Sequence, residues 1–319
     1  MHEALSTVPE EIAAAWERAR RFELANKYAD IFGVVILGAG AAGAAAAMAG
    51  AVIAHTAQVP VTVVSGEILP AFVGPDNLVI ACDTGDGAPE TLAALDEVTQ
   101  RGAKLVIVAP GEAWAAYAVA NRAPLLAISA ALPEPLMVGP LLVSLLATLG
   151  AAEVINGVRD MHVAAAVTVL RELRDTGITA GDDPITPNLA RQVARQIAGR
   201  LLAIEGLGLL APVAAWGRQR FAEYAHASVL SGEADNADLL AVSQSERAAV
   251  IALRSSFDPP LALAKARAAV EQRAGGKMPG AAIPAGGASR VAQTLWAAYF
   301  LDWVAQYLVA DASGLMQSS

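Results

Sequence analysis

The chain has 319 residues, of which 55% are apolar, 17% charged and 5% aromatic. This hydrophobicity and low charge exclude an intrinsically disordered chain, and a single cysteine, Cys82, excludes a disulfide-stapled scaffold. The formal charge of -9 argues against a nucleic-acid partner, because such binding depends on Lys and Arg side chains at phosphates. The length suits one large domain or two domains of ordinary size.

A mean hydropathy of +0.46 raises the question of a membrane span. Residues 31–54 and 135–152 are both uncharged and long enough to be considered. The first stretch is mostly Ala and Gly, and the second begins with Pro135, Gly139 and Pro140, which leaves room for only a short helix. Neither stretch is followed by a polybasic flank, and the partly acidic N-terminus does not have the pattern of a signal peptide. We therefore expect a cytoplasmic protein without a membrane partner.

The first half of the chain alternates helices with nearly continuous apolar strands. After a leading helix at 9–29, the predicted strands are 33–37, 61–64, 77–82, 104–108 and 124–128. The predicted helices are 41–57, 88–101, 112–120 and 138–150. Buried strands separated by helices are typical of a parallel sheet that is covered on both faces.

The same pattern starts again after a turn-rich segment that ends at Pro187. The predicted helices of this half are 188–199, 210–227, 260–274 and 287–310, and the predicted strands are 200–205, 248–253 and 280–284. Both halves open with a helix, an apolar strand, a Gly-x-Gly turn at Gly38 or Gly206, and a second helix, which indicates a weak tandem repeat. We predict an N-terminal domain at 1–152, a connector at 153–187 and a C-terminal domain at 188–319.

The first glycine turn matches a pattern that binds anions. Gly38-x-Gly40-x-x-Gly43 follows a predicted strand and lets backbone N–H groups approach an anion at the start of the next helix. The dinucleotide-binding version of this pattern has an acidic residue about 20 positions later. Here the next acid is Glu67, and a helix precedes the strand. An enzyme that binds NAD(P) or FAD is therefore kept only as a less favoured alternative.

A second turn and a C-terminal run extend the pattern. Asp83-Thr-Gly-Asp-Gly-Ala-Pro-Glu-Thr91 follows strand 77–82, and Gly206-Leu-Gly-Leu-Leu-Ala-Pro-Val-Ala214 precedes a helix that carries Glu223. The two turns resemble those of the sugar-isomerase (SIS) domain. The C-terminal run is similar to the Gly-x-Gly-x-x-Ala-Pro-Val-Ala and Asn-Glu-Asn-Ala-Lys motifs of the bifunctional phosphoglucose/phosphomannose isomerases.

This resemblance implies an α/β fold of two SIS-type, flavodoxin-like three-layer αβα domains with parallel sheets. It also implies a small-molecule sugar or sugar phosphate as ligand, a homodimer, and catalysis of aldose–ketose isomerisation without a cofactor or metal. In that family a glutamate moves a proton between C1 and C2, which is ordinary general-base chemistry. Serine and threonine hydroxyls hold the phosphate together with backbone N–H groups.

The resemblance assigns roles position by position. Glu223 matches the catalytic glutamate, Asn236 stands at the position of the family's histidine, and Ser313 lies near that of its C-terminal threonine. The arginine that precedes the last helix of the first domain falls within Pro133-Glu134-Pro135. The ligand-binding positions are Gly38, Gly40, Ala42, Gly43, Asp83, Gly85, Asp86, Ala88, Glu90 and Thr91.

The hydroxyls of the family's phosphate site are replaced in this chain. Ala42, Gly85 and Ala88 offer no hydroxyl, and Asp83 and Asp86 would face a phosphate with negative charge. A carboxylate about 4 Å from a phosphate costs roughly 4 kcal/mol per charge pair at an effective dielectric constant of 20. Two hypotheses therefore stay open, a phosphosugar isomerase and a non-catalytic SIS protein that binds a less anionic sugar or a nucleotide sugar.

Several of these residues also have ordinary structural interpretations. Glu223 can form a solvated pair with Arg220 one helical turn away, and His226, at the family's lysine position, can cap the end of its helix. Asp83 with Asp86 can fill a turn and cap a helix. Cys82 ends a predicted buried strand and is expected to be a small core residue. The four histidines and one cysteine offer no metal-ligand spacing.

Overall fold

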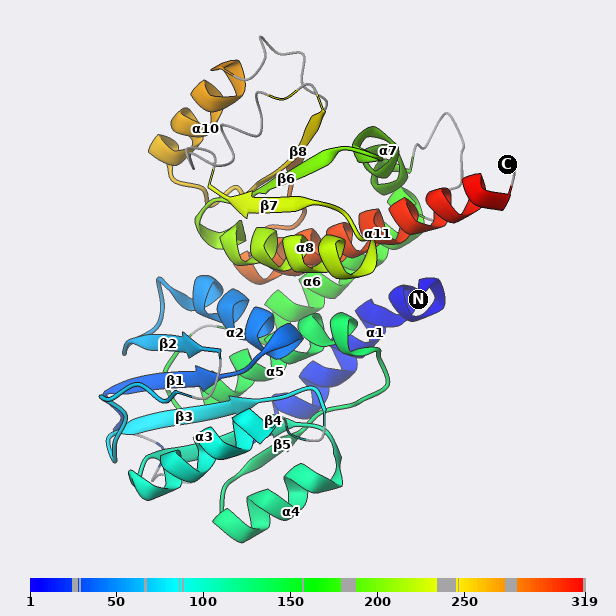
Figure 1. Ribbon diagram of the computed structural model, residues 1–319. Coiled ribbons are helices and arrows are strands. Elements are labelled where there is room, and N and C mark those ends of the chain that lie inside the picture. Colours follow the sequence, from blue (N-terminus) through cyan, green and yellow to red (C-terminus); the bar gives the residue numbers. More distant parts are fainter. Residues whose placement is uncertain are drawn as a thin grey trace. The chain divides into compact units, whose positions relative to one another are not determined.

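We analysed a computed structural model of the chain, which describes all residues except 25–27, 29, 66–67, 86, 88, 157, 179–187, 234–244, 246, 273–279 and 318–319. The chain divides into two compact units. Thr7–Ala164 forms the N-terminal unit, and Ala165–Ser319 together with Met1–Ser6 forms the C-terminal unit. Each unit is an α/β structure around its own parallel sheet (Figure 1). The predicted fold class is therefore confirmed.

The N-terminal unit contains a five-stranded parallel sheet in the order β2-β1-β3-β4-β5. Its strands are β1 (Gly33–Leu37), β2 (Val61–Val64), β3 (Asn77–Cys82), β4 (Lys104–Ala109) and β5 (Leu125–Ala127). In the centre of the sheet Leu37 pairs with Ala81, so β1 and β3 end side by side. The first three strands have the bounds that the runs of Val, Ile and Leu predict.

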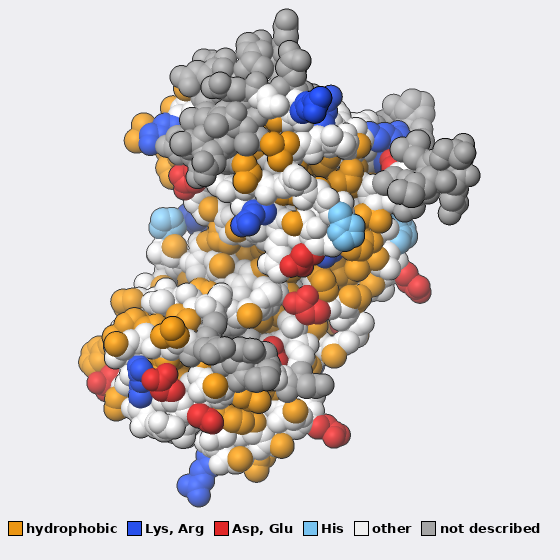
Figure 2. Space-filling view, viewed as in Figure 1, with side chains coloured by type: hydrophobic (Ala, Val, Ile, Leu, Met, Phe, Trp, Pro, Cys, Tyr) orange, Lys and Arg blue, Asp and Glu red, His pale blue; other side chains and the backbone are white. Residues whose placement is uncertain are grey.

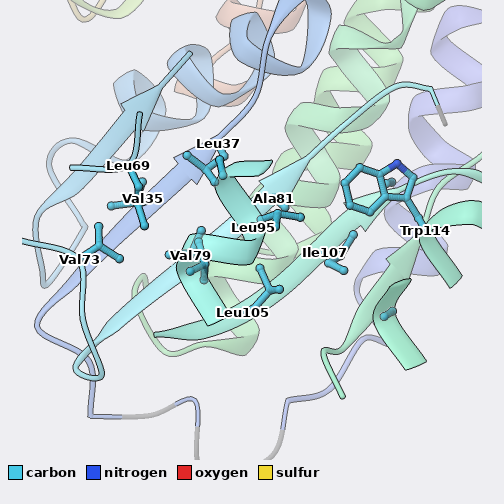
Figure 3. Packing of buried hydrophobic residues seen from close by; sticks show 14 residues of the cluster. Val35, Leu37, Leu69, Val73, Val79, Ala81, Leu95, Leu105, Ile107 and Trp114 are labelled. Atoms are coloured by element: carbon cyan, nitrogen blue, oxygen red, sulfur yellow. The ribbon is translucent and has the colours of Figure 1, made fainter. Parts of the chain in front are cut away.

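Helices cover both faces of this sheet (Figure 1). These helices are α2 (Gly40–Ile53) with α5 (Val138–Ala151) on one face, and α3 (Pro89–Gln100) with α4 (Gly111–Asn121) on the other. Alternate strand residues such as Val35, Val79 and Ile107 point toward Leu95 of α3 and Trp114 of α4 (Figure 3). The remaining strand residues face α2 and α5, which explains why the strands are apolar at consecutive positions.

The leading helix differs from the expected one at 9–29. Helix α1 (His2–Ala19) begins seven residues earlier and runs through Pro9. Proline cannot donate to the carbonyl four residues before it, and this carbonyl, that of Leu5, accepts instead from the Tyr299 hydroxyl at 3.0 Å. The helix therefore continues past a residue that the sequence analysis treats as its first position. Residues 25–27 and 29 of the expected helix lie outside the described residues.

Among the residues that the structure describes, one helical stretch is long and apolar enough to pass a test for a membrane span. It consists of the 3-10 turn η2 (Glu134–Met137) and α5, and 67% of the window Glu134–Ala151 is buried inside the structure. Leu141, Leu142 and Leu145 on α5 are fully buried. Such burial is what a core helix of a parallel α/β unit requires.

The C-terminal unit contains a four-stranded parallel sheet in the order β7-β6-β8-β9. Its strands are β6 (Leu201–Glu205), β7 (Val229–Gly232), β8 (Ala248–Arg254) and β9 (Gly280–Pro284). Its helices are α7 (Leu189–Ile197), the 3-10 turn η4 (Gly208–Leu210), α8 (Ala211–Tyr224), α10 (Pro260–Gln272) and α11 (Arg290–Gln317). Figure 1 shows α8 and α11 along one face of the sheet and α10 beyond the other. This order repeats β2-β1-β3-β4 of the N-terminal unit.

The sequence patterns do not predict strand β7 or the helices within the segment 153–187. The edge strand β7 reads Val-Leu-Ser-Gly and is half-buried along its length, so it carries little strand signal. The segment 153–187 contains helix α6 (Asp160–Glu172), which continues as a π-helix (Leu173–Ile178). The division between the two compact units falls inside α6, between Ala164 and Ala165. The segment that we treat as a connector is thus partly helical.

Glycines allow the strand-to-helix turn to close in each unit. A Cβ on Gly43 would lie 2.7 Å from the carbonyl oxygen of Gly38, and a Cβ on Gly206 would lie 2.2 Å from that of Leu210. Both distances are shorter than real Cβ contacts, and both involve backbone atoms that cannot rotate away. The turns therefore depend on glycine for close helix–strand approach.

Two glycines of the same helix provide a direct test of this dependence. We expect Gly43→Ala to lower the free energy of unfolding by about 2 kcal/mol or more, as backbone strain in a core does. Gly50→Ala in α2 is the control, because its Cβ would meet only Val63 at 4.0 Å. It should be neutral or stabilising by up to about 1 kcal/mol, the helix-propensity difference between Gly and Ala. Urea unfolding followed by circular dichroism measures both, and equal stability of the two variants would contradict the account.

Candidate functional site

The two predicted ligand-binding turns lie side by side at the carboxyl edge of the N-terminal sheet. The first turn follows β1 and leads into α2, and the second follows β3 and leads into α3. A Cβ on Gly38 would lie 3.2 Å from the carbonyl oxygen of Cys82, which shows how close the turns are. Helix N-termini at such an edge attract anions.

The first turn already has a carboxylate at the start of its helix. Glu134 Oε1 accepts a hydrogen bond from the Ala41 N–H at 2.9 Å, although the two residues are 93 positions apart. Gly40 has φ +53, and a Cβ on it would lie 2.9 Å from the same oxygen. In the sequence, Glu134 stands out only as a replacement for the family's arginine, and no motif predicts this contact. Its flanking prolines, Pro133 and Pro135, are the one signal for a side chain fixed in position.

The second turn is held by the side chain of Asp83. Asp83 Oδ2 accepts from the Gly87 N–H and from Trp114 Nε1, each at 3.0 Å. The Trp114 N–H also donates to the carbonyl oxygen of Gly85 at 3.0 Å, and the Trp114 side chain is buried. Asp83 thus fills the turn, as its structural interpretation states, and its Oδ2 is engaged by N–H groups of the protein itself.

The neighbouring predicted positions that the structure describes add no reactive group. Ala42 is buried in α2, and burial raises the pKa of the Cys82 thiol far above its usual range, with the Asp83 charge adding to the shift. Such a thiol stays protonated and unreactive. Thr91 belongs to α3 and is half-buried. Asp86, Ala88 and the side chain of Glu90 lie outside the described residues.

Glu223 projects from α8 in the C-terminal unit. Its side chain is exposed, and its Oε1 accepts a hydrogen bond from Gln219 Nε2 at 3.0 Å. The suggested solvated pair with Arg220 is wrong, because the Arg220 guanidinium is buried and donates to Asp302 of α11 at 2.8 Å. Arg220 is buried against α11, whereas the side chain of Glu223, three residues later on α8, is exposed.

The buried Arg220–Asp302 pair sets which face of α8 packs against α11. Asp302 is on α11, and burial raises the pKa of its carboxyl group, while the Arg220 charge opposes that shift. One turn further along, the Tyr224 hydroxyl donates to Gln306 Oε1 at 2.8 Å. These two contacts hold the inner face of α8 against α11. The outward direction of Glu223 is therefore set by neighbouring residues of its own helix.

The described residues do not bring the other predicted catalytic side chains into contact with Glu223. Asn236 lies outside the described residues, and so does the side chain of Ser313, whose backbone belongs to α11. His226 follows the end of α8 with φ +48 and is exposed. The Ala227 N–H donates to the carbonyl oxygen of Phe221 at 3.1 Å across it, which is the geometry of a helix C-terminal cap.

Internal side chains also tie the corresponding turns of the C-terminal unit. Gln293 of α11 is buried, and its Oε1 accepts from Ser255 Oγ at 2.6 Å and from the Ser256 N–H at 3.1 Å. Its Nε2 donates to Ser256 Oγ at 2.7 Å and to the carbonyl oxygen of Gly287 at 2.8 Å. Asp258 Oδ2 accepts from the Ser255 N–H at 2.8 Å. The polar groups of this turn are largely occupied by the protein.

The charged side chains on one face of the protein do not form a single basic or acidic patch. On the face shown in Figure 2, Lys and Arg side chains are scattered among carboxylates and apolar groups rather than gathered in one patch. Among the residues that the structure describes, no group of three His, Cys, Asp or Glu side chains could hold a metal ion.

Comparison with known proteins matches a domain family to each unit. Residues 29–145 match the SIS domain, and residues 186–315 match the bacterial phospho-glucose isomerase C-terminal SIS domain. The chain is a tandem SIS-domain protein. Its resemblance to the bifunctional phosphoglucose/phosphomannose isomerases, inferred from the motifs around Gly206 and Glu223, is supported by the second match.

One relative and two solved structures are similar to this tandem SIS protein. The bifunctional phosphoglucose/phosphomannose isomerase of Caldicellulosiruptor bescii is 27% identical over 207 residues, which are 65% of this chain and 60% of that relative's length. The C-terminal domain of glucosamine-fructose-6-phosphate aminotransferase from Francisella tularensis has a TM-score of 0.71 at 14% identity, with 97% and 95% of the chains covered. A hypothetical protein from Thermus thermophilus has a TM-score of 0.73 at 15% identity, with 98% and 89% covered. These structures share the fold.

Removing the Asp83 carboxylate tests its role in the second turn. We expect Asp83→Ala to lower the free energy of unfolding by about 1.5–3 kcal/mol, the usual contribution of hydrogen bonds to a charged group. Asp83→Asn keeps an acceptor oxygen and should lose less. The exposed Asp76→Ala is the control and should stay within about 0.5 kcal/mol of the wild type. Urea unfolding followed by Trp fluorescence measures all three, and an Asp83→Ala variant as stable as the control would refute the role.

Proposed function

We propose that this tandem SIS protein is a non-catalytic sugar-binding or regulatory member of the phosphosugar-isomerase group, and that its ligand is a sugar or nucleotide sugar with little charge at the N-terminal turns. The proposal depends mainly on the hydrogen bonding in the second turn. A phosphate cradle at this turn needs open N–H groups and hydroxyls, whereas the Gly87 N–H already donates to the chain's own Asp83 carboxylate.

The composition of both turns supports the same conclusion. Ala42 is buried without a hydroxyl, and Gly85 has no side chain to offer. A sugar phosphate brought to Asp83 meets a carboxylate at short range, with a cost of roughly 4 kcal/mol per charge pair at about 4 Å. Uncharged hydroxyl groups meet no such cost, because a carboxylate oxygen accepts hydrogen bonds from them.

A second function, aldose–ketose isomerisation of glucose-6-phosphate or mannose-6-phosphate to fructose-6-phosphate, is favoured by Glu223 alone. This carboxylate is retained on α8 at the family's catalytic position and stays exposed. Proton transfer between C1 and C2 also requires that the substrate is positioned within hydrogen-bond reach of the base. The altered turns remove the phosphate contacts that position it. Homodimerisation stays a prediction of the family resemblance, and a cytoplasmic location stays a prediction from the hydropathy pattern.

Two assays on the purified chain separate the two functions. With glucose-6-phosphate, mannose-6-phosphate and fructose-6-phosphate, we expect no turnover above that of a Glu223→Gln control. In a thermal-shift series, neutral hexoses or nucleotide sugars should raise the melting temperature more than phosphosugars do. Turnover that disappears in Glu223→Gln would establish the isomerase instead, and stabilisation by phosphosugars alone would contradict the proposed ligand class.

A further inference from the structure

We infer that Glu134 is a tethered anion that determines the ligand class of the first glycine turn: it occupies the position that a ligand phosphate would take at the start of α2 and selects a neutral, hydroxyl-bearing sugar group there. This inference rests on the proposed function and names the residue that sets its specificity. The observation behind it is the hydrogen bond from the Ala41 N–H to Glu134 Oε1 at 2.9 Å.

Helix α2 has no acceptor of its own for these N–H groups. Its N-cap residue, Ala39, has no side-chain hydrogen bond, and its first turn contains no acidic residue. The first N–H groups of a helix have no partner within the helix and form a positive end. A remote glutamate therefore supplies both the acceptor and the negative charge that this end requires.

The backbone on both sides makes this contact specific. Gly40 has φ +53, and a Cβ there would lie 2.9 Å from Glu134 Oε1, so only glycine admits the carboxylate this closely. Glu134 starts η2 between two prolines, and Leu136 and Met137 of the same turn are buried. The carboxylate is thus attached to a fixed segment and not to a flexible loop.

A fixed internal carboxylate competes strongly with a free anion. A group tethered on the same chain acts at an effective concentration of about millimolar or above, and needs no association step. Its negative charge also repels a phosphate directly, an effect that weakens with salt because Glu134 is exposed. The glycine turn keeps its anion-binding backbone while a free phosphate is excluded from it.

The remaining carboxylate oxygen indicates which ligand group fits. Glu134 Oε2 accepts no hydrogen bond from any residue that the structure describes. It is a strong acceptor at the edge of the turn, and a sugar hydroxyl is a matching uncharged donor. The ligand expected at this turn is therefore a hexose unit without a phosphate at the group that meets Glu134.

Charge removal at this one position tests the inference. Inorganic phosphate is titrated by isothermal calorimetry, at low ionic strength, into the full chain carrying Glu134→Ala, Glu134→Gln or the control Glu112→Ala. Glu112 is also an exposed glutamate, in the first turn of α4 of the same unit. We expect Glu134→Ala to bind phosphate at least about tenfold more tightly than the wild type and the control, because one unit of like charge is removed at short range.

The Glu134→Gln variant distinguishes the effect of the charge from the effect of a destabilised fold. It keeps an oxygen for the Ala41 N–H without the charge, so it should remain as stable as the wild type and gain an intermediate affinity for phosphate. Phosphate binding equal in all four proteins, or tightest in the wild type, would overturn the inference. Failure of neutral sugars to stabilise the wild type would count against the proposed function instead, because the phosphate comparison does not depend on it.

Discussion

Backbone N–H groups at the carboxyl edge of a parallel sheet must find acceptors, and this constraint governs both units of the protein. Parallel strands end together, and each following helix begins there with unpaired N–H groups. The chain supplies its own acceptors: Glu134 for the first turn, Asp83 for the second, and Gln293 with Asp258 in the C-terminal unit. These contacts tie together segments that are far apart in sequence. They also occupy the edge where ligands of such folds usually bind.

The protein has the tandem SIS architecture, with carboxylates of its own chain at the N-terminal turns of the sheet edge. The glycine turns still let helices approach strands closely, and the Arg220–Asp302 pair still fixes α8 so that Glu223 faces outward. Glu134 and Asp83 accept hydrogen bonds from N–H groups of the two N-terminal turns. In the function that we propose, these carboxylates disfavour the contacts that position a phosphosugar. The proposed sugar-binding role requires only the carboxylate acceptors at the carboxyl edge of the sheet and hydroxyl donors on the ligand.

The strands and the repeated topology could be predicted from the sequence because buried parallel strands are continuous apolar runs. The bounds of β1 and β3 follow directly from such runs, bounded by glycine or a polar turn. Local patterns failed where tertiary contacts decide the outcome. Pro9 reads as a helix start, yet α1 continues through it because Tyr299 satisfies the carbonyl of Leu5. The edge strand β7 is half-buried and contains Ser and Gly, so its pairing with β6 is not visible in its own sequence.

The sequence predicts where the candidate site lies, but it does not predict the hydrogen-bond partners of its side chains. The two glycine turns and Glu223 could be located from motif spacing. The partners of the carboxylates could not, because Glu134 meets Ala41 across 93 residues and Asp83 meets Trp114 across 31. The family resemblance suggested that Asp83 faces a ligand, and helical spacing suggested that Arg220 pairs with Glu223. In the structure, Asp83 accepts from Trp114, and Arg220 donates to Asp302.

A crystal structure of the protein grown with fructose-6-phosphate tests the central claim most directly. The account predicts that Glu134 Oε1 remains on the Ala41 N–H and Asp83 on the Gly87 N–H, with no phosphate density at residues 38–43 or 83–91. Phosphate density bonded to the Ala41 N–H, with the Glu134 side chain displaced from the turn, would contradict it.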